Sequence, residues 1–342
     1  MMIIRPFFCL LLIVAVGPGA SADITGAYSG WLDTFGSMSD DNSGLSTFPT
    51  LLVPMGGRYE GMGTAYTAVV GDLGFIEANP AGSAEISNTA VGFYHHQWYA
   101  DTSLEGVAFA TRLGPLGIGT GFKFFYSSFT EYDDSGNRAS SGYLFEGVAI
   151  LNLAVKVISL ERFGLSIGTS AKGVYRYVPE SLAVDQSAGA VPIDVGALLG
   201  LKLLDLSKIS RRNFTIGLSL KNFGQRVFAL GSPLPTVFSA GLAYSPLAFL
   251  LISSDFNMPI SVEPDTFPAE AVYFSVGTDV TIAKFLSVQA GARFKADNPR
   301  FSIGAVVGLG QVSLTTNYVI DIVSGFNPLD TLNIAATIDI GS

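Results

Sequence analysis

Apolar and polar residues alternate with a period of two over most of this chain. From residue 88 to the C-terminus, apolar side chains occupy every second position, and polar side chains or glycine lie between them. In one such segment Leu165 and Ile167 share one face, whereas Ser166 and Lys172 share the other. This period is typical of β-strands in a sheet with one apolar and one polar face.

Turn signals such as Gly114-Pro115 and Asp133-Asp134-Ser135-Gly136-Asn137 separate the alternating segments. Each segment is about ten residues long, which is the length that a tilted strand needs to cross a membrane. We predict an all-β fold, a 14-stranded antiparallel transmembrane β-barrel over residues 88–342. Its strands begin near residues 89, 103, 117, 142, 163, 189, 213, 236, 248, 270, 285, 300, 311 and 329.

Composition favours a membrane barrel over the alternatives. The chain is 49% apolar and only 14% charged, against a usual charged share of about 25%. The longest apolar run, residues 7–16, is too short for a membrane-spanning helix, which excludes a helical transporter. A soluble sandwich of so many strands would lack solubilising charges, and no period of about 40–50 residues indicates a propeller.

The N-terminus is typical of an export signal. Arg5 precedes the apolar run, and Ala20-Ser21-Ala22 supplies a small-x-small cleavage pattern. We predict a signal peptide over residues 1–22, cleaved near Ala22, and localisation in the cell outer membrane. Cleavage removes Cys9, the only cysteine. The net charge of −9 disfavours nucleic acid as a partner, because phosphates need a basic surface.

Two segments lie between the signal peptide and the barrel. Residues 23–50 form a polar extension without clear periodicity, and residues 51–87 are rich in glycine and alanine. Small residues predict a short helix over 64–70, and Asn79-Pro80 predicts a turn. No strand precedes these glycines and no Gly-Lys-Ser/Thr follows, which disfavours nucleotide binding.

The glycine-rich segment resembles the N-terminal hatch of the FadL-type outer-membrane long-chain fatty-acid transporters, and it is similar to related PorV-type barrels. The resemblance implies a monomer whose lumen is closed by a hatch over residues 51–87. A hydrophobic ligand such as a long-chain fatty acid would enter from outside and leave through the hatch or sideways into membrane lipid. The matching residues are Gly57-x3-Gly61-Met62-Gly63-x-Ala65-Tyr66-x-Ala68, Asp72 and Asn79-Pro80-Ala81-Gly82.

The resemblance also indicates candidate site residues. The Asn79-Pro80-Ala81 triplet would be the hatch element near the ligand, and family members tend to have an irregular third strand beside a lateral gap. Gly117, Gly119 and Gly121 would allow such a kink, or they only relieve crowding inside the barrel. The residues assigned to the hatch or ligand gate are Gly57, Arg58, Gly61, Met62, Gly63, Asp72, Asn79, Pro80 and Ala81.

The alternation places several charged side chains on the lumen face. In one interpretation they form a network that holds the hatch, because charges kept from lipid must be paired or hydrated. In the other, a cation such as Lys172 or Arg293 binds a fatty-acid carboxylate through charge-assisted hydrogen bonds. The predicted lumen charges are Glu146, Lys172, Asp194, Lys221, Asp279, Arg293, Lys295 and Asp339.

Catalysis has little support in the sequence. His95 and His96 are the only histidines, and adjacent residues of a strand face opposite sides. We interpret them as interfacial polar groups beside Trp98 and Tyr99 in an aromatic girdle, rather than as a catalytic base or a metal site. We therefore expect no enzyme activity, no cofactor and no metal.

The predicted function is outer-membrane uptake of long-chain fatty acids or similar hydrophobic molecules by hatch-gated passive diffusion. The alternative is a PorV-like barrel that acts as a structural or secretion adaptor and binds protein partners. A general aqueous porin is disfavoured, because a hatch would block its pore.

Overall fold

The computed structural model describes residues 45–98, 102–180, 182–203, 212–225, 232–261, 269–296, 299–321 and 331–341. All of them belong to one compact unit, residues 40–342. The predicted signal peptide, residues 23–44 of the predicted extension, and Tyr99 lie outside the described residues.

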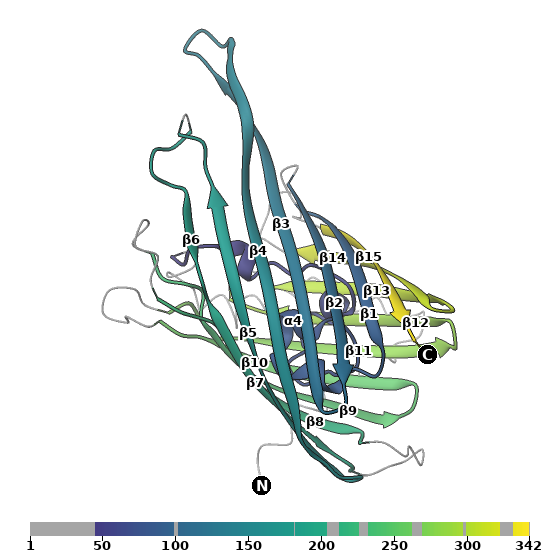
Figure 1. Cartoon of the computed structure of the whole chain (residues 1–342). Helices are drawn as coiled ribbons and strands as arrows, with labels where there is room; N and C mark the ends of the chain where they lie inside the picture. Colours follow the sequence, from purple (N-terminus) through teal and green to yellow (C-terminus); the bar gives the residue numbers. More distant parts are fainter. Residues whose placement is uncertain are drawn as a thin grey trace. The chain divides into compact units, whose positions relative to one another are not determined.

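Fourteen strands close into an antiparallel barrel in the described part of the chain (Figure 1). Each pairs with its neighbours along the chain, and the first strand pairs with the last to complete the ring. The strands are β1 (Thr89–Gln97), β2 (Ser103–Leu113), β3 (Leu116–Tyr132), β4 (Arg138–Ser159), β5 (Phe163–Tyr177), β7 (Ile193–Leu201), β8 (Phe214–Phe223), β9 (Val237–Leu247), β10 (Leu250–Pro259), β11 (Tyr273–Ala283), β12 (Leu286–Phe294), β13 (Arg300–Leu309), β14 (Val312–Asp321) and β15 (Thr331–Ile340).

The predicted strand count is confirmed, with one difference in detail. The segment predicted to begin near residue 189 is divided into a short strand, β6 (Ala188–Ala190), and β7. β6 pairs only with β5 and is not part of the ring. Pro192 lies between the two strands, and it has no N–H to donate to a ladder.

The two faces of the wall follow the predicted alternation. In β5, Ser166, Ser170 and Lys172 face the lumen and are buried, whereas Ile167 is exposed on the outside. Leu151 on the outer face of β4 is 68% exposed. An apolar outer face of this kind suits contact with lipid, and the polar face lines the lumen.

The connections differ at the two ends of the barrel. Tight turns join β2 to β3, β9 to β10 and β13 to β14 at one end, here called the short-turn end. The opposite, long-connection end carries the links between β5 and β7, β8 and β9, and β10 and β11. β3 and β4 extend well beyond the rest of this end (Figure 1), and residues 127–144 pair only within their own hairpin.

The predicted girdle position of Trp98 beside the two histidines is wrong. Trp98 is 7% exposed and packs edge-on against His96 inside the lumen, because it lies two residues after His96 and just beyond the end of β1. His95 faces outward and pairs with Glu105 at 2.8 Å. The aromatic cluster on the outer face, with ring centroids 5.2–6.5 Å apart, consists of Phe122, Phe124, Tyr126, Phe145, Tyr175 and Tyr177.

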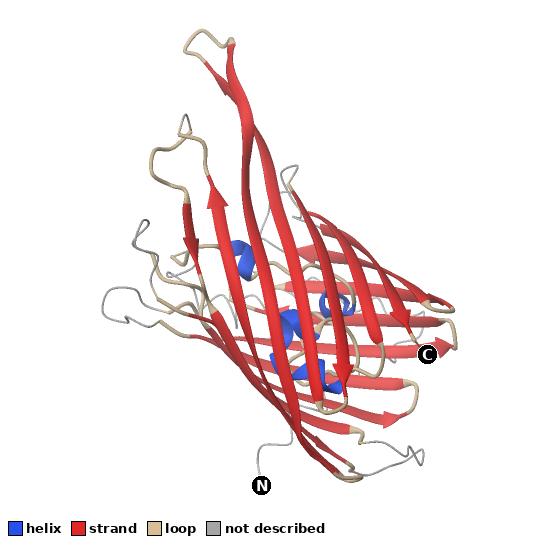
Figure 2. Cartoon of the chain, viewed as in Figure 1, coloured by secondary structure: helices blue, strands red, loops and turns tan. Residues whose placement is uncertain are grey.

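Residues 45–86, here called the inner segment, lie inside the barrel (Figure 2). The helices in it are η2 (Pro49–Leu51), α3 (Arg58–Gly61), α4 (Phe75–Ala78) and η3 (Pro80–Glu85). Phe48 is fully buried, so residues 45–50, which we assigned to the extension, pack with the predicted hatch. Among the described residues, no helix is both long and apolar enough to span a membrane.

The helix predicted over residues 64–70 is not formed. Thr64 has a φ of 62°, which a helix does not accommodate. The N–H groups of Tyr66 and Thr67 donate instead to the Asp255 carboxylate of β10, at 2.8 and 2.9 Å. A contact with a distant strand thus replaces the local hydrogen bonds that small residues would otherwise form.

Candidate functional site

The inner segment contacts the barrel wall at glycines. A Cβ added to Gly217 would lie 2.1 Å from the carbonyl oxygen of Thr67, and one on Gly291 would lie 2.1 Å from the nitrogen of Gly63. Real Cβ atoms do not approach so closely, so glycine is required there for backbone to meet backbone. Wall glycines with an inner-segment backbone atom within 2.5 Å of such a Cβ are Gly117, Gly168, Gly217, Gly277 and Gly291.

The glycines of the hatch motif meet the wall from the other side. Gly57 and Gly63 have φ values of 70° and 62°, in the left-handed region that favours glycine. A Cβ on Gly61 would lie 2.4 Å from Oδ1 of Asn317. The Gly57 carbonyl accepts a hydrogen bond of 2.7 Å from Asn317. Met62, beside Gly61, is fully buried.

Arg58 and Asp72 belong to a polar network that joins α3 to the wall. Nε of Arg58 donates to Asp279 of β11 at 3.0 Å, and its Nη1 donates to Asp72. The hydroxyl of Tyr66 also donates to Asp72, and Gln289 of β12 donates to Asp279 at 2.9 Å. The lumen charge at Asp279 therefore holds the inner segment, as one of the two interpretations expected.

Asn79, Pro80 and Ala81 bind the opposite part of the wall. Nδ2 of Asn79 donates to Thr67 within the inner segment at 2.9 Å and to Ala197 of β7 at 3.2 Å. Its Oδ1 accepts from Ala81, and the Pro80 carbonyl accepts from Asn152 of β4 at 2.9 Å. None of the triplet lines the cavity described below. A contact with a ligand there would require the inner segment to move.

The three glycines of the third strand accommodate the inner segment. A Cβ on Gly117 would lie 2.2 Å from Ser83, one on Gly119 would lie 2.9 Å from Phe75, and one on Gly121 would lie 3.2 Å from Ile76. β3 pairs without a register shift to β2 throughout, and to β4 at all three glycines. The structure thus matches the interpretation that they relieve crowding, and it has no break in pairing there.

Sequence reasoning missed several polar residues that hold the inner segment. Nζ of Lys123 lies 2.8 Å from Glu77, and Asn333 donates to Glu60 at 2.6 Å. Burial raises the pKa of the Glu60 carboxyl above its ordinary value, against the opposing effect of His96. The alternation places Lys123, Asp255 and Asn333 on the inward face, but it does not show which partner each one meets.

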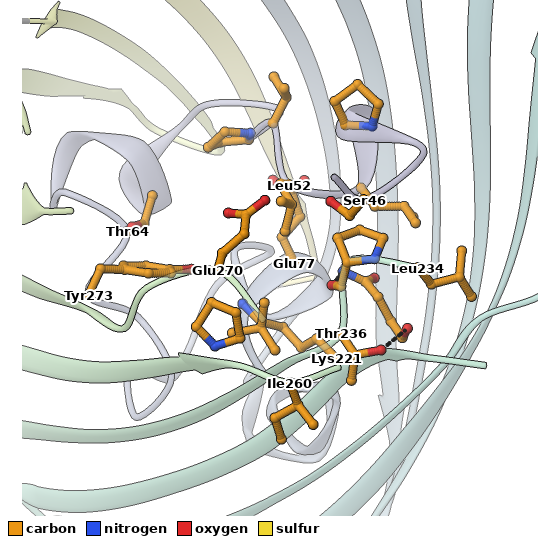
Figure 3. Close-up of a pocket in the computed structure, with 18 of the residues that line it drawn as sticks. Ser46, Leu52, Thr64, Glu77, Lys221, Leu234, Thr236, Ile260, Glu270 and Tyr273 are labelled. Atoms are coloured by element: carbon orange, nitrogen blue, oxygen red, sulfur yellow. Dashed lines mark hydrogen bonds between the residues drawn. The ribbon is translucent and has the colours of Figure 1, made fainter. Parts of the chain in front are cut away.

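A cavity of about 430 Å³ lies between the inner segment and the long-connection end. Its lining combines apolar side chains with a group of cations. Figure 3 shows part of this lining, including Leu52, Leu234 and Lys221. The volume falls within the range of small-molecule sites. The apolar and aromatic residues that line it include Leu51, Leu52, Val53, Tyr59, Trp98, Val148, Ile150, Leu234, Val237, Ile260 and Tyr273.

Most charges in this cavity are already neutralised. Lys172 is paired with Asp194 at 2.7 Å, Lys123 with Glu77, and Lys295 with Glu270. Lys172, one of the two predicted carboxylate partners, therefore has its own counter-ion.

Arg293, the other predicted carboxylate partner, differs. In the described part of the chain its buried Nε has no hydrogen-bond partner, and its guanidinium lies 6.0 Å from the centre of the Tyr273 ring. A buried donor without a partner is costly. A cavity that combines apolar side chains with such a cation can bind an amphiphile that has an anionic head. Within the described ranges, no group of three or more His, Cys, Asp or Glu residues is placed to hold a metal.

Solved structures of channels resemble this barrel. The toluene transporter TodX of P. putida has a TM-score of 0.55 at 12% identity, covering 83% of this chain and 98% of that one. The monoaromatic hydrocarbon channel CymD gives 0.53 at 13% identity, covering 83% and 97%. A Pseudomonas aeruginosa FadL homologue gives 0.51 at 11% identity, covering 81% and 96%. The likeness is one of fold, and it defines a closed barrel of the FadL and TodX type.

The sequence places the chain in a family. It belongs to the uncharacterised protein family UPF0164, which it matches over residues 33–338. One UPF0164 protein of Treponema pallidum (strain Nichols) is 29% identical over 327 residues, which are 92% of this chain and 73% of the relative. Another is 24% identical over 331 residues, covering 79% and 80%. The FadL-type relationship that the hatch motif indicated is therefore supported by fold and not by family.

Proposed function

We propose that this protein takes up long-chain fatty acids or similar hydrophobic molecules across an outer membrane, with the inner segment as the gate. The observation that carries the proposal is the cavity next to the inner segment, which combines apolar side chains with cations and includes Arg293, whose Nε has no hydrogen-bond partner among the described residues. The fold shared with channels for hydrophobic molecules and the export signal predicted for residues 1–22 support the outer-membrane location.

The gating role rests on how completely the inner segment is bound. Its backbone meets wall glycines, and its polar groups are tied to β4, β7, β10 and β11. A ligand in the cavity would reach the short-turn end only after some of these contacts break. Transport would then be passive diffusion. One chain would suffice for it, because the ring closes within a single chain.

Equilibrium binding of oleate tests this proposal. The purified protein in lipid nanodiscs should bind oleate saturably, and R293Q should weaken that binding about tenfold or more, because a charge-assisted contact is lost. R112Q is the control, since Arg112 is exposed near the short-turn end. Partition of oleate equal to that of empty nanodiscs would contradict the proposal.

One feature favours the alternative adaptor function. Residues 127–144 form a two-stranded ribbon whose outer edges pair with no other strand in the described structure. Unpaired edges can accept a strand of another protein. Co-purification of a secreted protein that depends on this ribbon, without any binding of oleate, would support the adaptor.

A further inference from the structure

One wall of the cavity contains an irregular strand. Between the pairs Val195↔Leu220 and Ile193↔Phe223, β7 has one residue, Asp194, whereas β8 has two. An extra residue on one strand of an antiparallel pair is a β-bulge. The second of the two, Asn222, has a φ of 57°, a left-handed conformation that few residues other than glycine and asparagine adopt.

Buried polar contacts fix the bulge. The N–H of Asn222 donates to Asp194 at 2.7 Å, and its side-chain amide donates to the Pro235 carbonyl at 3.1 Å. Lys172 donates to Oδ1 of Asn222 at 2.8 Å and also pairs with Asp194. These contacts fix the backbone conformation of Asn222, directly after Lys221. The charge of Asp194 is neutralised by Lys172.

Lys221 projects from this bulge into the cavity (Figure 3). Both bulge residues face the lumen, and Phe223 returns to the outer face. Among the described residues, no hydrogen bond or ion pair holds the Lys221 amine. The cations Lys123, Lys172 and Lys295 differ in this respect, since each has an acidic partner.

Among the described residues, the cavity therefore contains two cationic groups that no acid holds in a hydrogen bond or ion pair, Lys221 and Arg293. Both acids that line it, Glu77 and Glu270, are already paired. A neutral ligand would displace water from these cations and offer them only weak partners. An anionic head group would accept charge-assisted hydrogen bonds from them.

We propose that Lys221, positioned by the bulge at Asn222, is a specificity-determining residue that makes the cavity select anionic amphiphiles over neutral ones of the same shape. The inference rests on the proposed uptake function and names the ligand class of that site. Asn222 acts as a positioning residue, through the backbone conformation that it allows.

The test compares two probes with the same hydrocarbon chain, oleate and oleyl alcohol, on the purified protein in lipid nanodiscs. The wild-type protein should bind oleate at least about tenfold more tightly than the alcohol. K221M should remove most of that preference by weakening oleate binding, and the affinity for the alcohol should change less than about twofold. K284M is the matched control, because Lys284 is exposed in the turn between β11 and β12.

Variants of Asn222 test the positioning role. N222G keeps the left-handed backbone and should retain most of the preference for oleate, whereas N222A disfavours that conformation and should lose it. A purely structural role would weaken the binding of both probes equally. Should N222A fail to fold, which circular dichroism would reveal, K221M and N222G still decide the matter.

The outcomes separate this inference from the proposed function. If the wild-type protein binds neither probe, the proposed function is wrong and this inference falls with it. If both probes bind but the preference is absent, or is unchanged in K221M, only the role of Lys221 is wrong.

Discussion

Asp255 is a single side chain on which a whole stretch of the inner segment depends. Its carboxylate accepts the N–H groups of Tyr66 and Thr67, at 2.8 and 2.9 Å. D255A would leave two buried donors unsatisfied, at a cost of about 1–3 kcal/mol each. We expect a protease to cleave D255A faster than the wild-type protein within residues 64–70. Mass spectrometry of the fragments would locate the cleavage sites. D255N retains an acceptor oxygen and should stay largely protected. Equal cleavage of D255A and wild type would contradict this role.

Gly217 of the wall leaves no room for a side chain against the inner segment. G217A would place a methyl group 2.1 Å from the Thr67 carbonyl, so the inner segment must shift away from β8 while the strand pairing stays intact. We expect this shift to open a path for ions, visible as added conductance in planar bilayers. G173A is the control, because a Cβ at Gly173 meets no atom within 4 Å. Equal conductance of G217A and G173A would show that the contact between Gly217 and Thr67 tolerates the methyl group.

At the scale of elements, the β3–β4 ribbon is independent of the barrel. In the part of the chain that the structure describes, residues 127–144 pair only with each other, and an isolated two-stranded hairpin contributes little stability. Replacing residues 128–143 by a two-residue Asn-Gly turn should therefore leave the thermal unfolding temperature within a few degrees of wild type, as followed by circular dichroism. A large drop would mean that the ribbon supports the barrel through contacts other than strand pairing.

The elements also show how far sequence reasoning reaches. The period of two predicted the number of strands in the ring. It also predicted that Ser166 and Lys172 point into the lumen and that Ile167 points outward, because side-chain direction in a strand is a local property. The helix expected over residues 64–70 is replaced by contacts with Asp255, 188 or more positions away along the chain. Local patterns cannot show such a partner.

The candidate site was predictable only in part, for the same reason. Arg293 was expected on the lumen face, and it lines the cavity. The partner of Lys172, however, comes from the neighbouring strand β7, and the alternation gives no sign that Lys221 has no ion pair among the described residues. The bulge at Asn222 also follows no periodic signal. It depends on the pairing of β8 with β7, which forms only when the two strands meet.

For the whole molecule, the gating role proposed above requires the inner segment to move when a ligand passes. Thr64 and Ser275 of β11 approach to 3.3 Å between their hydroxyl oxygens, and the only cysteine lies in the predicted signal peptide. T64C/S275C should therefore form a single disulfide on oxidation. We expect oxidation to stop the passage of a fluorescent fatty acid into proteoliposomes and reduction to restore it. Passage unaffected by oxidation would show that this part of the segment stays in place.

The pairing of β1 with β15 also constrains how the molecule is made. The inner segment is synthesised before every strand, yet it is surrounded by all fourteen in the ring. The seam between Thr89–Gln97 and Leu332–Ile340 forms only after the last strand has emerged. The ring therefore closes at a time when the inner segment is already present, and assembly has to bring this segment into the lumen as well as pair the strands.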